Sequence, residues 1–334
     1  MRGQNGSRHS WISWWGPRVI HTPSELHIGR VIASLSHRSG MVRGPMDMAE
    51  ISEREIEDAR RAGSVGYLGR LLVQVTLPHS KPPSGCTSYE RRNGFISLEV
   101  LAPSRVGLPY GTYPRLLLSW ITTEAVLTKR PELDLGDSLS AFMTRLGLIP
   151  SGGRWGSIAR LRDHCSRLFS STISWTYERS KDGAWIHAGV KPVEYAQMFW
   201  DPAKPGQLAL SGPFRPFIRL SSSFFEEIIT RPVPLDMRVL QRLAQMRCPL
   251  AIDIYSWLSY RVSYLQNPVD IPWKWLAWQF GSDYAEIRYF RRQFIHWLRI
   301  VKEAAQWTDL NVEPQKDVLR LKPSLPHVLP RQLV

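Results

Sequence analysis

The sequence has few of the residues and none of the motifs on which several function classes depend. Its three cysteines, Cys86, Cys165 and Cys248, lie far apart with no C-x-x-C pair. This argues against a disulfide framework and a structural zinc site, and it suits a reducing cytoplasm. Apolar runs such as Leu116–Leu118 last only a few residues, whereas a membrane-spanning helix takes about 20. A membrane partner is therefore disfavoured.

Two catalytic motifs of DNA-processing proteins are also missing. There is no G-x-x-x-x-G-K-[ST] segment and no Gly-Lys pair, which excludes a phosphate-cradling ATP loop. The nine histidines include no His-x-His pair, which a rolling-circle initiator would need for its metal ion beside a catalytic tyrosine. Tyr260 and Tyr264 form a Y-x-x-x-Y pattern, but without a metal site we interpret them as helix surface and core. We expect no enzymatic activity and no cofactor.

Acidic residues are scarce relative to basic ones. The 29 Asp and Glu residues face 43 Lys and Arg residues, which gives a formal net charge of +14. Such a charge favours nucleic acid as the partner. The 14 tryptophans are expected mainly to fill hydrophobic cores.

The length of 334 residues allows two domains of ordinary size. Residues 1–45 hold six arginines and a single acid, Glu25, without lasting periodicity. They are interpreted as a disordered basic arm or as sequence upstream of the true start. The rest is divided into a first domain over residues 46–201, a Pro- and Gly-rich linker over 202–216 and a second domain over 217–334.

Residues 138–177 predict a DNA-binding arrangement. A short amphipathic segment ends at Gly147, a Pro-Ser-Gly-Gly turn follows, and a longer helical pattern then begins. One face of that helix carries Ile158, Leu161, Cys165 and Leu168, and the opposite face carries Ser157, Arg160, His164, Arg167 and Ser171. Short helix, turn, basic helix and strand follow in the order of a winged helix-turn-helix, whose second helix enters the major groove. An ordinary amphipathic helix with a solvated basic face would share this pattern.

A β-hairpin is predicted directly after the basic helix. Residues 172–177 and 184–187 are strand-like and flank an Asp182-Gly183 turn. The tip carries Arg179 and Lys181, as a DNA-contacting wing would, although a solvated tip would look the same. Gly152-Gly153, ahead of the helix, would let the backbone approach a DNA phosphate or would only permit the tight turn. Asp137 is predicted as the cap of the preceding short helix.

The same series of parts recurs in the second half of the chain. The fragment at residues 118–121 matches that at 255–258, Leu135 aligns with Ile271, and Leu146-Gly147 aligns with Phe280-Gly281, so the offsets run from 137 (118 to 255) to 134 (146 to 280). A second basic helix from Ser282 to about residue 307 is followed by a hairpin over residues 310–321. The predicted fold is therefore α+β, with two tandem winged-helix domains, each a helix-turn-helix with a β-hairpin wing, related by internal duplication.

Further elements are predicted from periodicity and turn signals. They are a charged helix over residues 49–62, a strand over 71–77, a hairpin over 89–100 with an Asn93-Gly94 turn, a helix over 115–129, a short strand over 132–135, a strand over 217–229, helices over 236–246 and 250–264, a short strand over 269–272 and a helix over 273–280.

Several motifs are also similar to those of a known family. They are Gly107–Gly111, Pro114–Trp120, Thr122–Ala125, Leu135–Leu139, Phe142-Met143, Leu146–Leu148 and Gly152–Gly156. In these segments the chain resembles the RepA-type plasmid replication initiators of bacteria, with similarity from Val65 to His327. The resemblance implies a protein that binds repeated sites at a plasmid origin, helps to open the duplex and brings in the host initiation proteins and replicative helicase. The alternative is a plasmid-borne transcriptional repressor or assembly module that binds an operator and never melts DNA.

The DNA-contacting residues are chosen from helical phase rather than from the family. They are Arg154, Ser157, Arg160, His164, Arg167, Arg179 and Lys181 in the first copy, and Arg288, Arg291, Arg292, Arg299 and Lys302 in the second. The apolar face of the second helix is expected to be Ile287, Phe290, Phe294, Trp297 or Leu298, and Val301. Two such helices in one chain would let a monomer act as a pseudo-dimer, with a homodimer on a palindromic site as the alternative.

Overall fold

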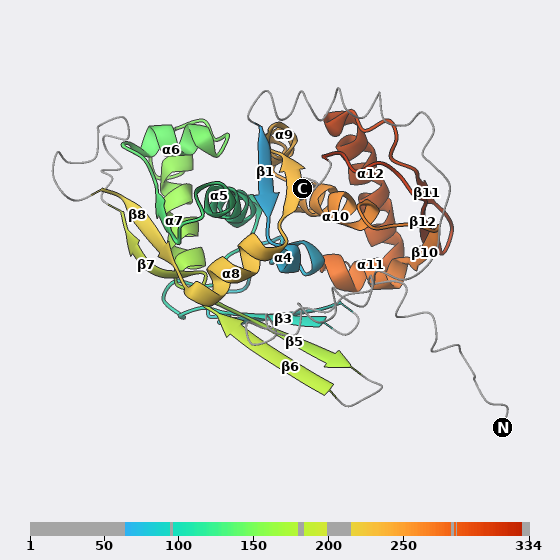
Figure 1. Ribbon diagram of the computed structural model, residues 1–334, viewed down its shortest axis with the longest axis horizontal. Coiled ribbons are helices and arrows are strands. Elements are labelled where there is room, and N and C mark those ends of the chain that lie inside the picture. The colour runs from blue at the N-terminus through green and yellow to red at the C-terminus, as the bar shows by residue number, and fades with distance from the viewer. Residues whose placement is uncertain are drawn as a thin grey trace, which may run out of the picture.

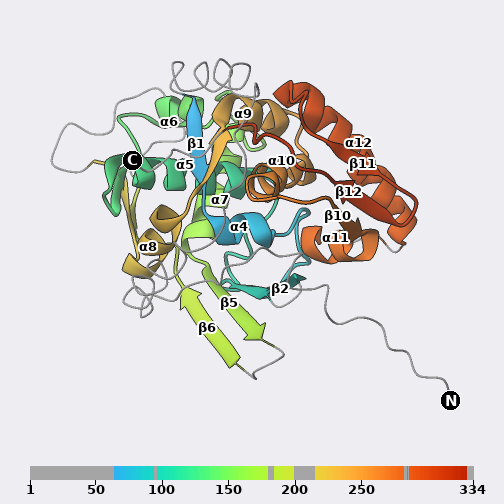
Figure 2. The same ribbon diagram turned by 45° about the vertical axis from the view of Figure 1, so that its right-hand side comes forward.

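Two helices from different halves of the chain form the centre of the molecule. The computed structural model describes residues 64–93, 96–179, 184–198, 215–281, 284 and 286–328. Within these residues, helices α5 (Thr112–Thr128) and α10 (Pro249–Val262) lie near the middle in Figure 1, with α6 and α7 to the left and α11 and α12 to the right. Figure 2 again shows α12 at the right-hand side. Helices and sheets mix throughout, which confirms the predicted α+β class.

Apart from α12, the other helices and the strands of the described residues are shorter than α5 and α10. The helices are α4 (Arg70–Gln74), α6 (Leu139–Arg145), α7 (Ser157–Phe169), α8 (Ser222–Thr230), α9 (Met237–Gln245), α11 (Trp273–Phe280) and α12 (Ile287–Ala305). The strands are β1 (Val65–Leu68), β2 (Ser88–Asn93), β3 (Ile96–Leu101), β4 (Glu132–Asp134), β5 (Thr172–Arg179), β6 (Ala184–Val190), β7 (Val193–Gln197), β8 (Phe217–Leu220), β9 (Val233–Asp236), β10 (Val269–Pro272), β11 (Val312–Pro314) and β12 (Val318–Leu321).

The two halves share one order of elements and one sheet topology. With β5 and β6 left aside, the first half runs α5, β4, α6, α7, β7, β8 from its central helix onward, and the second runs α10, β10, α11, α12, β11, β12. Each half ends in an antiparallel three-stranded sheet, in the order β4-β8-β7 in the first and β10-β12-β11 in the second. In the first sheet Leu133 pairs with Ile218, and in the second Ile271 pairs with Leu319.

Two hairpins of the first half have no counterpart among the described residues of the second. The β2–β3 hairpin lies between α4 and α5, and the β5–β6 hairpin lies between α7 and β7. They pair through β3 and β5, with Leu98 opposite Trp175, and so build one four-stranded sheet in the order β2-β3-β5-β6. This sheet extends from the lower side of the molecule in Figure 1.

The hairpin predicted as the wing of the first half does not occupy the position of its counterpart in the second half. The β5–β6 hairpin exists as predicted, but the place that β11 and β12 take in the second half is taken in the first by β7 and β8. Alternating residues identify a hairpin without revealing which strand it will join, so the sequence could not separate the two. Strand β8 follows the predicted linker and pairs with β4 and β7, which precede it.

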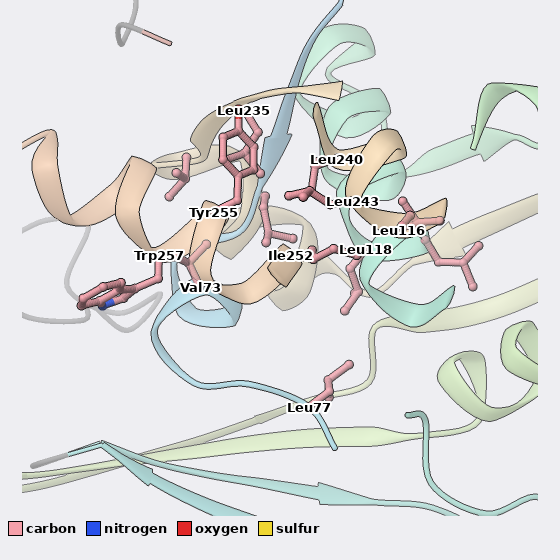
Figure 3. Close-up of a cluster of buried hydrophobic side chains, with 14 of the residues drawn as sticks. Val73, Leu77, Leu116, Leu118, Leu235, Leu240, Leu243, Ile252, Tyr255 and Trp257 are labelled. Atoms are coloured by element: carbon pink, nitrogen blue, oxygen red, sulfur yellow. The ribbon is translucent and has the colours of Figure 1, made fainter. Parts of the chain in front are cut away.

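The halves are joined by strand pairing as well as by helix packing. Strand β1 pairs antiparallel with β9, with Val65 opposite Asp236 and Leu68 opposite Val233. The buried hydrophobic residues form one cluster that crosses both halves. Figure 3 shows part of it, with Leu116 and Leu118 of α5 close to Leu240 and Leu243 of α9. Burying each such side chain contributes about 1.5–3 kcal/mol, so the halves stabilise one another.

Most predicted elements are confirmed, including the hairpin at residues 89–100, helix α5 and the elements from α9 to β12. Two predicted strands are wrong. The segment at residues 71–77 begins as helix α4, and the segment at 217–229 is strand only to Leu220. There Ser221 caps a new helix, because its hydroxyl accepts a hydrogen bond from Phe224 N at 3.3 Å and Phe224 and Ile228 share the buried face.

The predicted cap Asp137 is also wrong. Ser138 caps α6, with its hydroxyl accepting from Ala141 N at 3.2 Å. The predictions for residues 1–45 and for the helix at 49–62 fall outside the described residues, as does most of the predicted linker.

Candidate nucleic-acid interface

Helix α12 presents a basic stripe to solvent. Arg288, Arg292, His296 and Arg299 are all exposed, and their spacing of four, four and three residues places them on one helical face. Tyr289 lies beside them, with the guanidinium carbons of Arg288 and Arg292 at 4.9 Å and 5.3 Å from its ring centroid. Arg288 also pairs with Glu286 at 2.6 Å. The stripe thus offers several donors for phosphates and base edges.

Two other predicted contacts on α12 have packing partners instead. Arg291 is half-buried and its guanidinium lies 5.8 Å from the Trp273 ring centroid. Lys302 Nζ donates to Leu310 O at 2.8 Å, which ties α12 to the segment before β11. Of the five predicted residues of this helix, three therefore lie on the exposed stripe. His296 and Tyr289 were missed, although the four-residue spacing from Arg288 to Arg292 to His296 was visible in the sequence.

Aromatic packing holds α12 in place. Phe290, Phe294, Leu298 and Val301 are buried as predicted, whereas Ile287 is 47% exposed and lies off the apolar face. The Phe294 ring meets Trp257, Phe280 and Trp273 edge-on at centroid distances of 6.4, 5.3 and 5.8 Å. Edge-to-face pairs at these distances contribute stabilising energy beyond that of the area they bury. The packing therefore fixes the position of α12 and of the basic stripe that it carries.

The first half of the chain supports the C-terminal end of α11. Gly281 has φ +61°, and Arg91 of β2 donates from Nη2 to its carbonyl at 3.0 Å. Arg91 Nε donates in turn to the Tyr89 hydroxyl at 2.7 Å. Thr76 adds a second link, with its hydroxyl donating to Gln279 O at 3.3 Å. The C-terminal end of α11 is thus held partly by Arg91 of β2 and by Thr76, both from the other half.

The predicted polar face of α7 is largely covered by protein. Ser157, His164 and Ser171 are buried, and Arg160 and Arg167 are half-buried. This corrects the predicted exposure, since the exposed positions of α7 are Arg162, Asp163 and Ser166. The physical reason is tertiary: the segment 107–113 that leads into α5 packs against the face that helical phase alone assigned to solvent.

His164 and Arg167 make this packing specific. The His164 ring stacks on Tyr113 and meets Tyr110 edge-on, both at 4.9 Å, and burial lowers the pKa of the imidazole to about 4. Arg167 Nε donates to Asp163 Oδ2 at 2.7 Å, and its guanidinium lies over Tyr110 at 5.4 Å. A Cβ at Gly107 would lie 2.5 Å from Arg167 Nη1, so this glycine allows the close approach. We interpret both side chains as docking α7 onto the body of the protein.

The remaining predicted residues of the first copy fall into two groups. Arg154 is exposed in the segment between α6 and α7, beside Gly153 with φ +83°. The β5–β6 hairpin is present, but its tip with Lys181 lies outside the described residues, and so does the side chain of Arg179.

Burial raises the pKa of Tyr260 to about 12, and burial also raises that of Tyr264, whose hydroxyl accepts from Arg261 Nη1 at 2.6 Å. A nucleophilic tyrosine would need a stabilised phenolate, which is the opposite shift. Among the residues that the structure describes, no group of three His, Cys, Asp or Glu side chains could hold a metal ion. No helix in that part of the chain is long and apolar enough to cross a membrane.

Comparison with known proteins gives two kinds of similarity. Residues 108–278 match the sequence family described as plasmid encoded RepA protein, a match that ends within α11. Two crystal structures of domains 2 and 3 of RctB are similar to the chain, each at 14% identity. They cover 77% and 75% of this chain and 97% and 96% of theirs, with TM-scores of 0.47 and 0.46. No curated protein matches in sequence.

Proposed function

This chain belongs to the family of plasmid-encoded RepA proteins, which are replication initiators, and we propose on that premise that it binds repeated duplex sites at a plasmid origin. Binding there would promote opening of the duplex and bring in the host replication initiator and the replicative helicase. The protein itself would contribute recognition and would catalyse no reaction.

The observation that carries this proposal is the exposed stripe of α12. Arg288, Arg292 and Arg299 are exposed on α12, which follows α11 in the chain and precedes β11 and β12. We propose that α11 and α12 act as a helix-turn-helix pair, with α12 as its reading helix. Arginine reads guanine through two hydrogen bonds in the major groove, worth about 1–3 kcal/mol for each contact. We propose these three residues as DNA contacts, with His296 and Tyr289 beside them.

We further propose that the protein is a tandem of two winged-helix units that arose by duplication. The shared element order and the matching sheet orders β4-β8-β7 and β10-β12-β11 support this. The first unit would contact duplex DNA through Arg162 and the β5–β6 hairpin with Arg179 and Lys181. Ser157 and His164 are buried, so they would support α7 rather than touch bases.

Footprinting on a cloned origin tests both proposals. One monomer with two reading helices should protect two dissimilar half-sites about 10–10.5 base pairs apart on one DNA face. Binding should also weaken steeply with salt, because each neutralised phosphate releases about 0.9 counterion. A palindrome bound only by dimers would contradict the tandem reader. Protection of a promoter operator without any origin opening would favour a repressor instead.

A further inference from the structure

The segment between α6 and α7 presents two large apolar side chains to solvent. Ile149 is 79% exposed and Trp155 is 80% exposed, more than any other large hydrophobic side chain of the described residues. Tryptophan buries more apolar area than most residues when it is covered. Two such side chains left uncovered on one short segment indicate a contact surface.

Hydrogen bonds close this segment into a defined loop. Ser157 N donates to Ser151 Oγ at 2.9 Å, and Ser151 N donates to Ser157 Oγ at 2.8 Å. Ser157 Oγ donates in turn to Ile149 O at 2.6 Å. A Cβ at Gly156 would lie 2.2 Å from Ser151 O, so only glycine fits there. The loop has its shape before any partner arrives, which lowers the entropy cost of binding.

A cation accompanies the exposed indole. The guanidinium carbon of Arg154 lies 5.2 Å from the centroid of the Trp155 ring, and both side chains are exposed. The loop leads directly into the N-terminus of α7, where the helix dipole adds to the attraction for a negative charge. A flat aromatic face beside a cation is the chemistry that binds a nucleobase and its phosphate.

We propose that Trp155 stacks on a nucleobase that becomes unpaired when the origin duplex opens, while Arg154 pairs with a phosphate of the same strand. This inference rests on the proposed function and adds to it a site at which the protein binds one separated DNA strand. A nucleic-acid occupant is favoured over an apolar one by the net charge of +14 and by Arg154 next to the ring. Ile149, at the other end of the loop, would widen the apolar platform.

The test compares the full-length wild-type protein with Trp155→Ala in three measurements. They are the affinity for duplex origin DNA, the affinity for a single-stranded origin oligonucleotide by fluorescence anisotropy, and permanganate reactivity of origin thymines in a supercoiled plasmid. Stacking of one base on an aromatic ring is worth about 5- to 150-fold in affinity. We expect a loss of that size for the single strand and loss of permanganate reactivity, with duplex affinity within about twofold of wild type. Trp155→Phe should retain most single-strand binding.

Trp278→Ala is the matched control, because Trp278 is also exposed, at 48%, and has Lys274 Nζ 5.0 Å from its ring centroid. It should leave single-strand affinity unchanged. Equal losses from both changes would overturn the inference, as would a Trp155→Ala protein that binds single strands and opens the origin like wild type. A parallel loss of duplex affinity would assign Trp155 to duplex reading and would also overturn it. Failure of the wild-type protein to bind the duplex origin would contradict the proposed function itself. That outcome is distinct from the results that would overturn only the role of Trp155.

Discussion

Arg115 of α5 and Asp253 of α10 form a buried ion pair between the two halves of the chain. Arg115 Nε and Nη2 donate to the two carboxylate oxygens of Asp253, each at 2.7 Å. The remaining guanidinium donors reach the carbonyls of Leu77 at 2.8 Å and Gly111 at 2.7 Å. His79 Nε2 lies 2.7 Å from Asp253 Oδ2 and completes the cluster. Burial by itself raises the pKa of Asp253, but Arg115 and His79 outweigh it and hold that pKa below its ordinary value.

Removing one partner of this pair should destabilise the protein strongly. We expect Asp253→Ala to lower the free energy of unfolding by about 3–5 kcal/mol, because it leaves a buried guanidinium uncompensated. Urea denaturation measures the loss. The matched control is Glu132→Ala, since Glu132 and its partner Arg219 are each about half exposed and such pairs contribute about 0–1 kcal/mol. Similar losses for both variants would contradict the interface role of the buried pair.

His164 should make stability depend on pH. Burial lowers the pKa of its imidazole from 6.5 to about 4, so between these values the unfolded chain binds more protons than the folded one. Stability is therefore full above pH 6.5 and is lost as pH falls towards 4, by an amount of the order of 3 kcal/mol. His164→Phe keeps a ring against Tyr113 and should flatten the denaturation profile across this window.

The matched control for this prediction is His296→Phe on the exposed face of α12, which removes an imidazole without touching the buried stack. Burial likewise lowers the pKa of His79, against the opposing effect of its hydrogen bond to Asp253, so its contribution to the pH dependence has the same sign. A His164→Phe protein with the wild-type pH profile would show that the stack does not govern acid stability.

Replacing an arginine on α12 should affect DNA binding, whereas replacing one on α7 should affect stability. Arg292→Ala removes an exposed donor and should cost about 1–3 kcal/mol in binding to the specific site if it reads a base. Arg167→Ala should instead lower the melting temperature and leave DNA affinity nearly unchanged, because Arg167 bonds to Asp163 and covers Tyr110. Thermal denaturation and gel-shift titration of both variants test this. An equal loss of DNA affinity in the two variants would mean that Arg167 contacts DNA directly.

Arg91 should act as a positioning residue for α12. Arg91→Ala removes the bond to Gly281 O, and we expect a loss of about tenfold in DNA affinity, close to the value of one charge-assisted hydrogen bond. Since Arg91 would touch no phosphate, the salt dependence of binding should keep its wild-type slope, whereas loss of a phosphate contact lowers it by about 0.9. Arg105→Ala in an exposed loop is the control. A changed slope for Arg91→Ala would mean a direct DNA contact.

The sequence by itself determined the local elements and their repetition. Helical periodicity located α5, α7, α10, α11 and α12, because a buried apolar stripe at a spacing of 3.6 residues follows from backbone geometry alone. The correspondence between residues 118–121 and 255–258 anticipated the shared order of elements in the two halves. The basic face of α12 was also predicted from the sequence. The prediction holds for Arg288, Arg292 and Arg299 because no other segment of the described chain covers them.

Only the tertiary structure decided which polar faces meet solvent and which strands pair. The polar faces of α7 and α12 look alike in sequence, but segment 107–113 covers His164 and Arg167. Those contacts join residues far apart in the chain, as the separation of 59 positions between Arg167 and Leu108 shows. The pairing of β3 with β5 and of β4 with β8 likewise joins distant segments. Arg115 and Asp253 each lie in a mostly apolar helix, which indicates a buried charge but does not identify its partner. Pairing between distant residues depends on how the whole chain packs, and the local sequence pattern does not predict it.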